Sequence, residues 1–194
     1  MTASTPEQPL VLADAPAWHD WLLAHEGRSD GEWLVLAKKG TLDPTSLSYQ
    51  EALDEALCGG WIDGQRRSRD EGTFLQRFTP RRPRSIWSQR NVAIIARLEE
   101  EGRIRERGRA EVERARADGR WDAAYAGPAT AEVPPELEAA LAEDDAARAA
   151  FETLNRTNRF SVLHPVFSAR DAPARERAVA WAVRRLRGDG SGTR

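Results

Sequence analysis

The stretch WIDGQRRSRDEGTFLQRF, residues 61–78, decides how this chain folds. Residues 61–68 and 73–78 each predict a strand, because Trp, Ile and Phe favour extended backbone. Between them, the sequence Asp70-Glu71-Gly72 predicts a turn. The two phenylalanines of the second segment fall on one face of a strand. We therefore predict that these two segments form a β-hairpin.

Further strands and helices are predicted before the hairpin. Residues 33–37 (WLVLA) form a short apolar run that is typical of a buried strand, and residues 10–12 predict a shorter one. Asp14 is placed to cap a first helix, and Ser48 with Glu51 forms a capping box for a second. The pattern predicts an α+β fold with a small mixed sheet of about four short strands and helices.

The chain beyond the hairpin is predicted to become helical. Residues 79–84 hold two prolines and predict a loop, and Ser85 is placed to cap the next helix. After Pro134-Pro135 the pattern is that of a C-terminal helical module, in which Pro165 is predicted to kink or break a helix. We expect a disordered lead with a short strand at 1–13, an α+β domain at 14–127, the helical module at 128–187 and a flexible tail at 188–194.

The composition excludes several classes of protein. Lys and Arg total 29 and Asp and Glu total 31, and the net charge of −2 argues against a histone-like nucleic-acid binder. The single cysteine, Cys58, allows no internal disulfide and no multi-cysteine metal site. No apolar run approaches the roughly 18 residues of a membrane span, and residues 1–9 lack a signal-peptide pattern. We therefore expect a cytoplasmic protein.

The sequence contains no motif of a known catalytic or cofactor site. His19 and His25 are six residues apart, whereas metal-binding histidines on a helix prefer a spacing of three or four. His164 lies in an apolar segment, which favours a structural role. Nucleophile-elbow, zinc-protease, phosphate-loop and dinucleotide-binding patterns are absent from the sequence. It predicts no catalytic residue, no metal and no cofactor.

The small net charge hides a strong asymmetry along the chain. Residues 61–90 contain eight arginines against three acidic residues, a net charge of +5. Residues 131–155 contain seven acidic residues against one arginine, a net charge of −6. An arginine cluster of this kind forms a solvated face, pairs with an acidic segment, or holds an anion such as a carboxylate or phosphate.

The hairpin and the loop after it contain our candidate ligand-binding site. Asp63 begins the glycine-flanked part of the first predicted strand, where it faces basic residues. The arginines are expected to gather around the helix start near Ser85, where free backbone N–H groups also favour an anion. The candidate ligand-binding residues are Trp61, Asp63, Gln65, Arg66, Arg77, Arg81, Arg82, Ser85 and Trp87.

Three functions fit these residues. The first is a non-enzymatic protein that binds a small anionic ligand or a protein partner. The second is an enzyme that acts on a small anionic substrate with Asp63 as acid or base, which requires Asp63 in a cleft with a perturbed pKa. The third, less favoured by the overall charge, is nucleic-acid binding through the basic hairpin, which predicts an affinity that falls steeply with salt.

Several motifs resemble one protein family. Residues 33–40 (WLVLAKKG) and residues 48–64 (SYQEALDEALCGGWIDG) are similar to segments of the YdeI/OmpD-associated proteins, also described as bacteriocin-protection proteins. Residues 77–88 (RFTPRRPRSIWS) form the most specific piece of the resemblance. Asn158-Arg159-Phe160 and Ser168-Ala169-Arg170 resemble the final helical portion of the family. The resemblance extends over roughly residues 14–187.

The resemblance implies a role in resistance to bacteriocins, cationic antimicrobial peptides or envelope stress. It implies no catalytic mechanism that maps onto individual residues. Two segments depart from the family pattern. Leu163-His164-Pro165 puts a proline where the family is expected to have an unbroken helix, and Asp171-Ala172-Pro173 replaces a more basic sequence.

Overall fold

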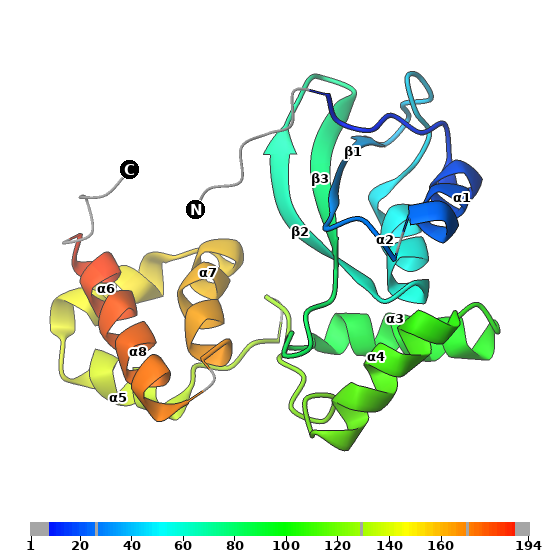
Figure 1. Ribbon diagram of the computed structural model, residues 1–194. Helices are drawn as coiled ribbons and strands as arrows, with labels where there is room; N and C mark the ends of the chain where they lie inside the picture. Colours follow the sequence, from blue (N-terminus) through cyan, green and yellow to red (C-terminus); the bar gives the residue numbers. More distant parts are fainter. Residues whose placement is uncertain (1–7, 26, 129, 170, 189–194) are drawn as a thin grey trace. The chain divides into compact units, whose positions relative to one another are not determined.

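The computed structural model describes residues 8–25, 27–128, 130–169 and 171–188. Most of the predicted disordered lead and of the predicted flexible tail lies outside these residues. The chain divides into two compact units (Figure 1). The first consists of residues 1–85 and 91–123, and we call it the α+β unit. The second consists of residues 86–90 and 124–194, and we call it the helical unit.

The α+β unit is built on a three-stranded antiparallel sheet with the strand order β1-β3-β2. The strands are β1 (Glu32–Ala37), β2 (Trp61–Ser68) and β3 (Thr73–Pro80). β2 and β3 form the predicted hairpin. Its turn is fixed by Asp70, whose carboxylate accepts hydrogen bonds from the backbone N–H groups of Gly72 and Thr73 at 3.0 and 2.7 Å.

The predicted α+β class is confirmed, but the sheet that the described residues form is antiparallel and not mixed, and it has three strands and not about four. Leu10 makes only an isolated bridge to Leu34, with its N–H donating to the Trp33 carbonyl at 2.8 Å. Pro9 has no N–H to extend this ladder on one side. On the other side, Asp14 already caps the first helix. The segment between them is too short to form a strand.

Two helices pack on the sheet and begin at the predicted caps. In α1 (Ala15–His25), the N–H of Ala17 donates to the Asp14 carboxylate at 3.0 Å. In α2 (Tyr49–Cys58), Ser48 and Glu51 form the predicted capping box. Trp18 of α1 is fully buried, and its indole N–H donates to the Ala52 carbonyl of α2 at 3.1 Å. This contact joins the two helices within the core.

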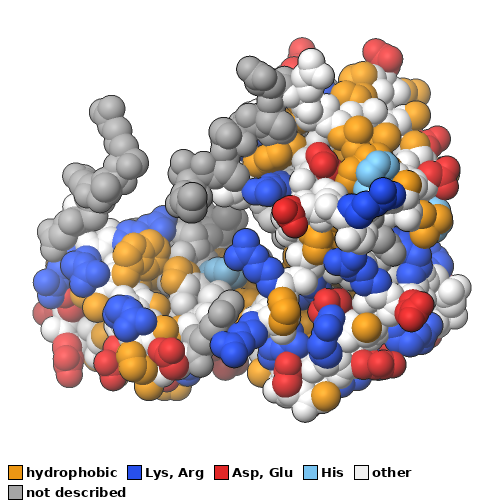
Figure 2. All heavy atoms as spheres, in the orientation of Figure 1, with side chains coloured by type: hydrophobic (Ala, Val, Ile, Leu, Met, Phe, Trp, Pro, Cys, Tyr) orange, Lys and Arg blue, Asp and Glu red, His pale blue; other side chains and the backbone are white. Residues whose placement is uncertain are grey.

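Helices α3 (Gln89–Glu100) and α4 (Glu106–Ala117) follow the hairpin. Figure 2 shows acidic and basic side chains interspersed over this part of the α+β unit. The predicted cap at Ser85 is wrong, since α3 begins only at Gln89. The Ser85 hydroxyl instead accepts a hydrogen bond from the N–H of Arg82 at 3.1 Å, which closes a turn in the preceding loop.

The helical unit packs four helices around one apolar core. They are α5 (Pro135–Ala142), α6 (Asp145–Thr153), α7 (Arg156–Phe167) and α8 (Ala172–Arg187). None of the helices in the described ranges is both long and apolar enough to cross a membrane. The buried residues of this core are Leu137, Leu141, Ala147, Phe151, Val162, Leu163, Val166 and Ala182.

The predicted break at Pro165 is not observed. Pro165 lies inside α7, and the helix continues to Phe167. A proline removes the hydrogen bond of its own N–H, and its ring crowds the carbonyl four residues earlier. Here Pro165 stands in the last turn, so only Val166 and Phe167 of the helix follow the perturbed position. Buried Leu163 and Val166 on either side pack into the core and hold the turn in place.

Part of the acidic stretch pairs with arginines of its own unit. Glu136 accepts from Arg175 of α8 at 3.1 Å, and Asp144 pairs with Arg187 of the same helix. These two ion pairs connect α5 and the start of α6 to α8. The acidic charge predicted for residues 131–155 is therefore neutralised in part inside the helical unit.

Asp144 is expected to make the stability of the helical unit depend on pH. Its pKa lies below the ordinary value, because the N–H of Ala147 and the Arg187 guanidinium stabilise the carboxylate. Such a group contributes stability above its unfolded pKa of about 4, and this is lost as pH falls through the folded pKa. Asn keeps a helix cap but removes the charge. Asp144→Asn should therefore lower the melting temperature near pH 7.

The pH dependence of this difference in melting temperature checks that the charge of Asp144 is responsible for it. Thermal unfolding followed by far-UV circular dichroism should give a gap between wild type and Asp144→Asn that narrows below about pH 4. A gap of constant size from about pH 3 to pH 7 would contradict the assignment, because an uncharged role of Asp144 does not titrate.

Candidate functional site

A β-bulge in the hairpin sets the direction of the predicted site residues on β2. Asp63 pairs with Phe78, whereas Arg66 pairs with Gln76, so β2 contains one extra residue between these pairs. Residues paired across antiparallel strands point to the same face. The bulge therefore places Asp63 and Arg66 on one face, although a regular strand would put residues three apart on opposite faces.

The side chain of Gln76 holds the bulge in place. Gln76 is buried in the sheet with only 3% of its surface exposed. Its amide donates to the backbone carbonyls of Gly64 and Gln65 at 3.0 and 3.1 Å. These two residues form the bulge and would otherwise lack ladder partners. Gln65 itself is exposed and contributes its backbone rather than its side chain.

Asp63 is tied to the first turn of α2. The hydroxyl of Tyr49 donates a hydrogen bond to the Asp63 carboxylate at 2.8 Å, and both side chains are half-buried. This contact connects β2 to α2. Asp63 is not among the residues that line the hollow described next. The hydrogen bond to Tyr49 indicates that Asp63 helps to position β2 against α2.

A basic hollow lies on the α+β unit beyond the bulge. It has a volume of about 410 Å³. Lys38 follows the end of β1, and the other lining residues come from β2 and β3. The lining contains no carboxylate, and Lys38 and Arg66 are its cationic side chains on this face of the sheet. Arg67 alternates with Arg66 along β2, and its guanidinium lies over Trp33 on the opposite face. We call it the basic hollow, and its residues are Lys38, Arg66, Arg67, Ser68 and Phe74.

The cationic groups of the basic hollow are held in defined positions. The Arg66 guanidinium lies over the Phe74 ring, with its central carbon 3.9 Å from the ring centre. The Lys38 ammonium donates to the backbone carbonyl of Asp70 at 2.7 Å, which leaves it two further N–H groups. Ser68 is exposed and adds a hydroxyl. Guanidinium, ammonium and hydroxyl donors together suit a carboxylate or a phosphate.

Several predicted site residues are buried in the structure. Trp61 is fully buried and packs edge-on against Trp18 and Trp21, with ring centres 6.2 and 6.0 Å apart. Arg81 is 5% exposed, and its N–H donates to the Gly60 carbonyl at 3.0 Å. These residues contribute to the packing of the α+β unit rather than to the lining of the basic hollow.

The remaining candidates lie in three separate places. Arg77 is half-buried and pairs with Trp33 across β1 and β3, on the face of the sheet opposite to Arg66. Arg82 is exposed and shares a turn with Ser85. Trp87 is buried and belongs to the helical unit, where its carbonyl accepts from the N–H of Tyr125 at 3.0 Å. Of the nine candidates, Arg66 is the one that lines the basic hollow.

Lys38, Arg67, Ser68 and Phe74 line the basic hollow but were not among the predicted site residues. Lys38 lies 28 positions before Arg66 in the chain and reaches it only through strand pairing. Its N–H donates to the Gly72 carbonyl at 2.8 Å, one step beyond the pair of Ala37 with Thr73. The signal that could have found it was the Lys38-Lys39 pair at the end of a predicted strand. The strand order was needed to use it.

A second polar cluster joins the helices of the α+β unit. Glu55 of α2 pairs with His19 of α1 at 2.8 Å and with Arg103 at 2.6 Å. Asp54 pairs with Arg97 of α3 at 2.6 Å. Both carboxylates are largely buried and satisfied by these partners. The cluster stabilises the packing of three helices. Its charged groups form ion pairs with one another.

The other reactive side chains are in settings that favour structural roles. Cys58 is buried, and this burial raises the pKa of its thiol to about 11, so it stays protonated at neutral pH. Burial also lowers the pKa of His164 below its ordinary value. Among the residues that the structure describes, no group of three or more His, Cys, Asp or Glu side chains is placed to hold a metal ion.

Comparison with protein families matches two parts of the chain to different family models. Residues 10–111 match the model described as a domain of unknown function, DUF8412. This match spans more than half of the chain. The chain belongs to the DUF8412 family. The match covers the whole sheet and α1 to α3, so the basic hollow lies within the DUF8412 region.

A second family model matches a separate part of the chain. Residues 130–188, which contain α5 to α8, match the model described as bacteriocin-protection, YdeI or OmpD-associated. The predicted resemblance to this family is confirmed for that region. The more specific motifs quoted from residues 33–88 lie in the DUF8412 match instead. No curated protein and no solved structure matches the chain.

Proposed function

We propose that this chain is a non-enzymatic protein of bacteriocin and stress resistance, whose α+β unit binds a small anion in the basic hollow. The observation that carries this proposal is the placement of Lys38 and Arg66 around one concave site whose lining contains no carboxylate. The bacteriocin-protection match of residues 130–188 supports the physiological role. The chemistry of the hollow supports the class of ligand.

The size of the basic hollow favours a small anion with several oxygens. A volume of about 410 Å³ lies at the lower end of the range for small-molecule sites. A guanidinium offers paired N–H groups in one plane, which match the two oxygens of a carboxylate or phosphate. The Lys38 ammonium acts as a point charge beside it. We expect phosphate esters and polycarboxylates to bind better than monovalent halides.

The structure supports the two alternative functions less well. An enzyme that uses Asp63 needs that carboxylate beside a substrate, whereas it accepts the Tyr49 hydroxyl and lies outside the basic hollow. A single-strand binder needs exposed aromatic faces on which bases stack. Here Arg66 lies over Phe74 and Arg67 over Trp33, so these rings are already covered. A small anion can use the Arg66 guanidinium without needing either ring.

Titration calorimetry with phosphate and citrate tests the proposed ligand class. Arg66→Ala should weaken the binding of the better ligand by at least about tenfold, because a hydrogen bond to a charged group contributes about 1.5–3 kcal/mol. Lys38→Ala should weaken it by a smaller factor. Arg82→Ala is the matched control, since Arg82 is an exposed arginine of the same basic segment outside the hollow. The affinity of the Arg82→Ala variant for the ligand should equal that of wild type.

Two results would overturn the proposal. Equal affinities of Arg66→Ala and wild type would remove the basic hollow as the binding site. A loss of affinity in Arg82→Ala alone would move the site to the loop that follows the hairpin. In cells exposed to a bacteriocin, expression of the wild-type chain should raise survival, and Arg66→Ala should reduce that benefit. Survival unaffected by the wild-type chain would remove the physiological part of the proposal.

A further inference from the structure

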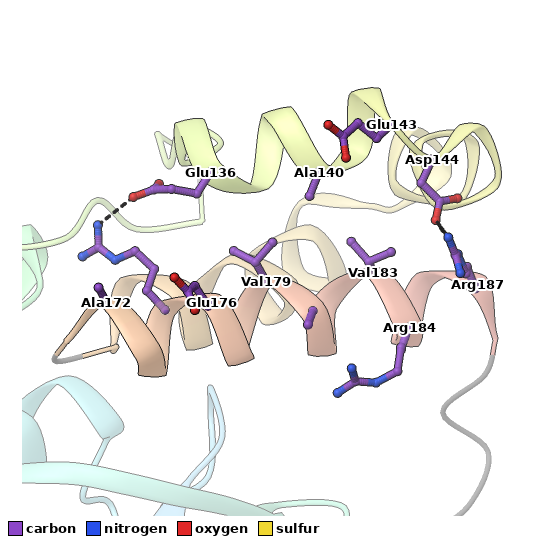
Figure 3. Close-up of a pocket in the computed structure, with 12 residues that line it drawn as sticks. Glu136, Ala140, Glu143, Asp144, Ala172, Glu176, Val179, Val183, Arg184 and Arg187 are labelled. Carbon is purple, nitrogen blue, oxygen red and sulfur yellow. Dashed lines mark hydrogen bonds and ion pairs between the residues drawn. The ribbon is translucent and has the colours of Figure 1, made fainter.

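A groove lies in the helical unit, between α5 and α8 (Figure 3). Its volume is about 670 Å³. Val179 and Val183 point from α8 toward α5, and Ala140 faces them from α5. The residues on the α8 side follow each other at intervals of three and four, so the groove runs along the whole helix. Its apolar residues are Ala140, Ala172, Val179, Ala180 and Val183.

Seven charged side chains line this α5–α8 groove, and four of them are already paired. Glu136 with Arg175 and Asp144 with Arg187 form the ion pairs described above, at the two ends of the groove. The other three are Glu143, Glu176 and Arg184, none of which has an ion-pair partner in the described part of the chain. An occupant of the groove must therefore offer charges opposite to these.

We infer that the occupant is a second copy of this chain, which docks its own α8 antiparallel against this face. Glu176 and Arg184 each lie four residues from Ala180, on opposite sides of it. Two antiparallel helices that cross at Ala180 bring Glu176 of one copy beside Arg184 of the other, and the reverse. A two-fold axis repeats every contact, so one register forms two ion pairs at once.

The other features of the groove fit this arrangement. Ala180 is exposed and small, which allows the two helix axes to approach closely at the crossing point. Arg184 points from α8 away from α5, so it can reach a neighbouring helix rather than its own unit. Glu143, on the α5 wall, adds a carboxylate toward the basic face of the arriving α8. Val179 and Val183 provide the apolar contact beside the charges.

Sedimentation equilibrium of the full chain tests this inference by a charge swap. The wild-type mass should rise from 21.6 kDa toward twice that value as concentration increases. Glu176→Arg and Arg184→Glu should each raise the dimer dissociation constant by at least about tenfold, because each places like charges opposite one another. The double variant Glu176→Arg/Arg184→Glu restores opposite charges and should return to within about threefold of wild type. High salt should weaken the wild-type dimer.

Arg156→Glu provides the matched control, because Arg156 is an exposed arginine of the same unit outside the groove. It should leave the dissociation constant unchanged. The inference is overturned if the wild-type chain stays monomeric up to about 0.5 mM, because a specific dimer has a dissociation constant below that concentration. A dimer that survives both single variants, or a double variant that stays monomeric, overturns the antiparallel α8 register. Circular dichroism of each variant verifies that α8 is folded.

Discussion

Replacement of Trp18 by alanine should lower the free energy of unfolding by about 3–5 kcal/mol, as expected for a buried aromatic side chain. Trp18 is fully buried, and its ring centre lies 5.2 Å from that of Trp21 and 5.8 Å from that of Phe78. The substitution leaves a cavity between α1 and the sheet. It also removes the indole hydrogen bond to Ala52. Both losses act at the centre of the α+β unit.

Urea unfolding followed by tryptophan fluorescence measures this loss, because five of the seven tryptophans belong to the α+β unit. Leu23→Ala is the control in the same helix. Leu23 is 55% exposed, so its removal should change the stability by no more than about 0.5 kcal/mol. Trp18→Phe should fall between the two, since it keeps part of the packing. A loss below about 1 kcal/mol for Trp18→Ala would mean that α1 contributes little to the core.

The sequence was sufficient to predict the elements that depend on local chemistry. The caps at Asp14 and at Ser48 with Glu51 act within one helical turn, so a short window contains all of their partners. The same is true of the hairpin, whose turn is closed by Asp70. Ser85 marks the limit of this reasoning. A serine before a helical pattern can bond to several nearby N–H groups, and here it bonds to that of Arg82.

The residues of the site come together through contacts between segments that are far apart in the sequence. Periodicity alone puts Asp63 and Arg66 on opposite faces of a strand, and the bulge held by Gln76 reverses this. The sheet order then brings Lys38 next to Arg66. The composition also suggested more arginines available to a ligand than the structure provides. Arg81 carries the same charge as Arg66, yet it is buried, and its backbone N–H pairs with Gly60 just before β2.

The packing of α4 against the turn between α2 and β2 explains how the strand that carries Arg66 is fixed at its start. A Cβ atom at Gly60, whose φ is +74°, would lie 3.1 Å from the Arg107 carbonyl. At Gly108, the approach is closer still. The N–H of Arg105 donates to the Cys58 carbonyl at 3.0 Å, at the end of α2. The first turn of α4 thus holds the residues from which β2 departs.

Gly108→Ala should therefore lower the free energy of unfolding by about 2 kcal/mol, although alanine is the better helix former by about 1 kcal/mol. A Cβ atom at Gly108 would lie 2.3 Å from the Cys58 carbonyl oxygen and 3.0 Å from that of Leu57. Both neighbours are backbone atoms, so neither can rotate aside. The helices must separate, and the Arg105 hydrogen bond must lengthen. Urea unfolding followed by tryptophan fluorescence measures the loss.

Gly127→Ala separates this steric effect from the general effect of removing a glycine. A Cβ atom at Gly127 meets no other atom within 4 Å, so this variant should be as stable as wild type or slightly more stable. If Gly108→Ala were also neutral, α4 would have to dock more loosely than the contacts with Cys58 require. If it is destabilised as expected, anion binding at the basic hollow should still be retained under folding conditions. The clash lies at the end of α2, whereas Arg66 and Ser68 lie beyond the bulge of β2, in a hairpin held by its own turn and ladder.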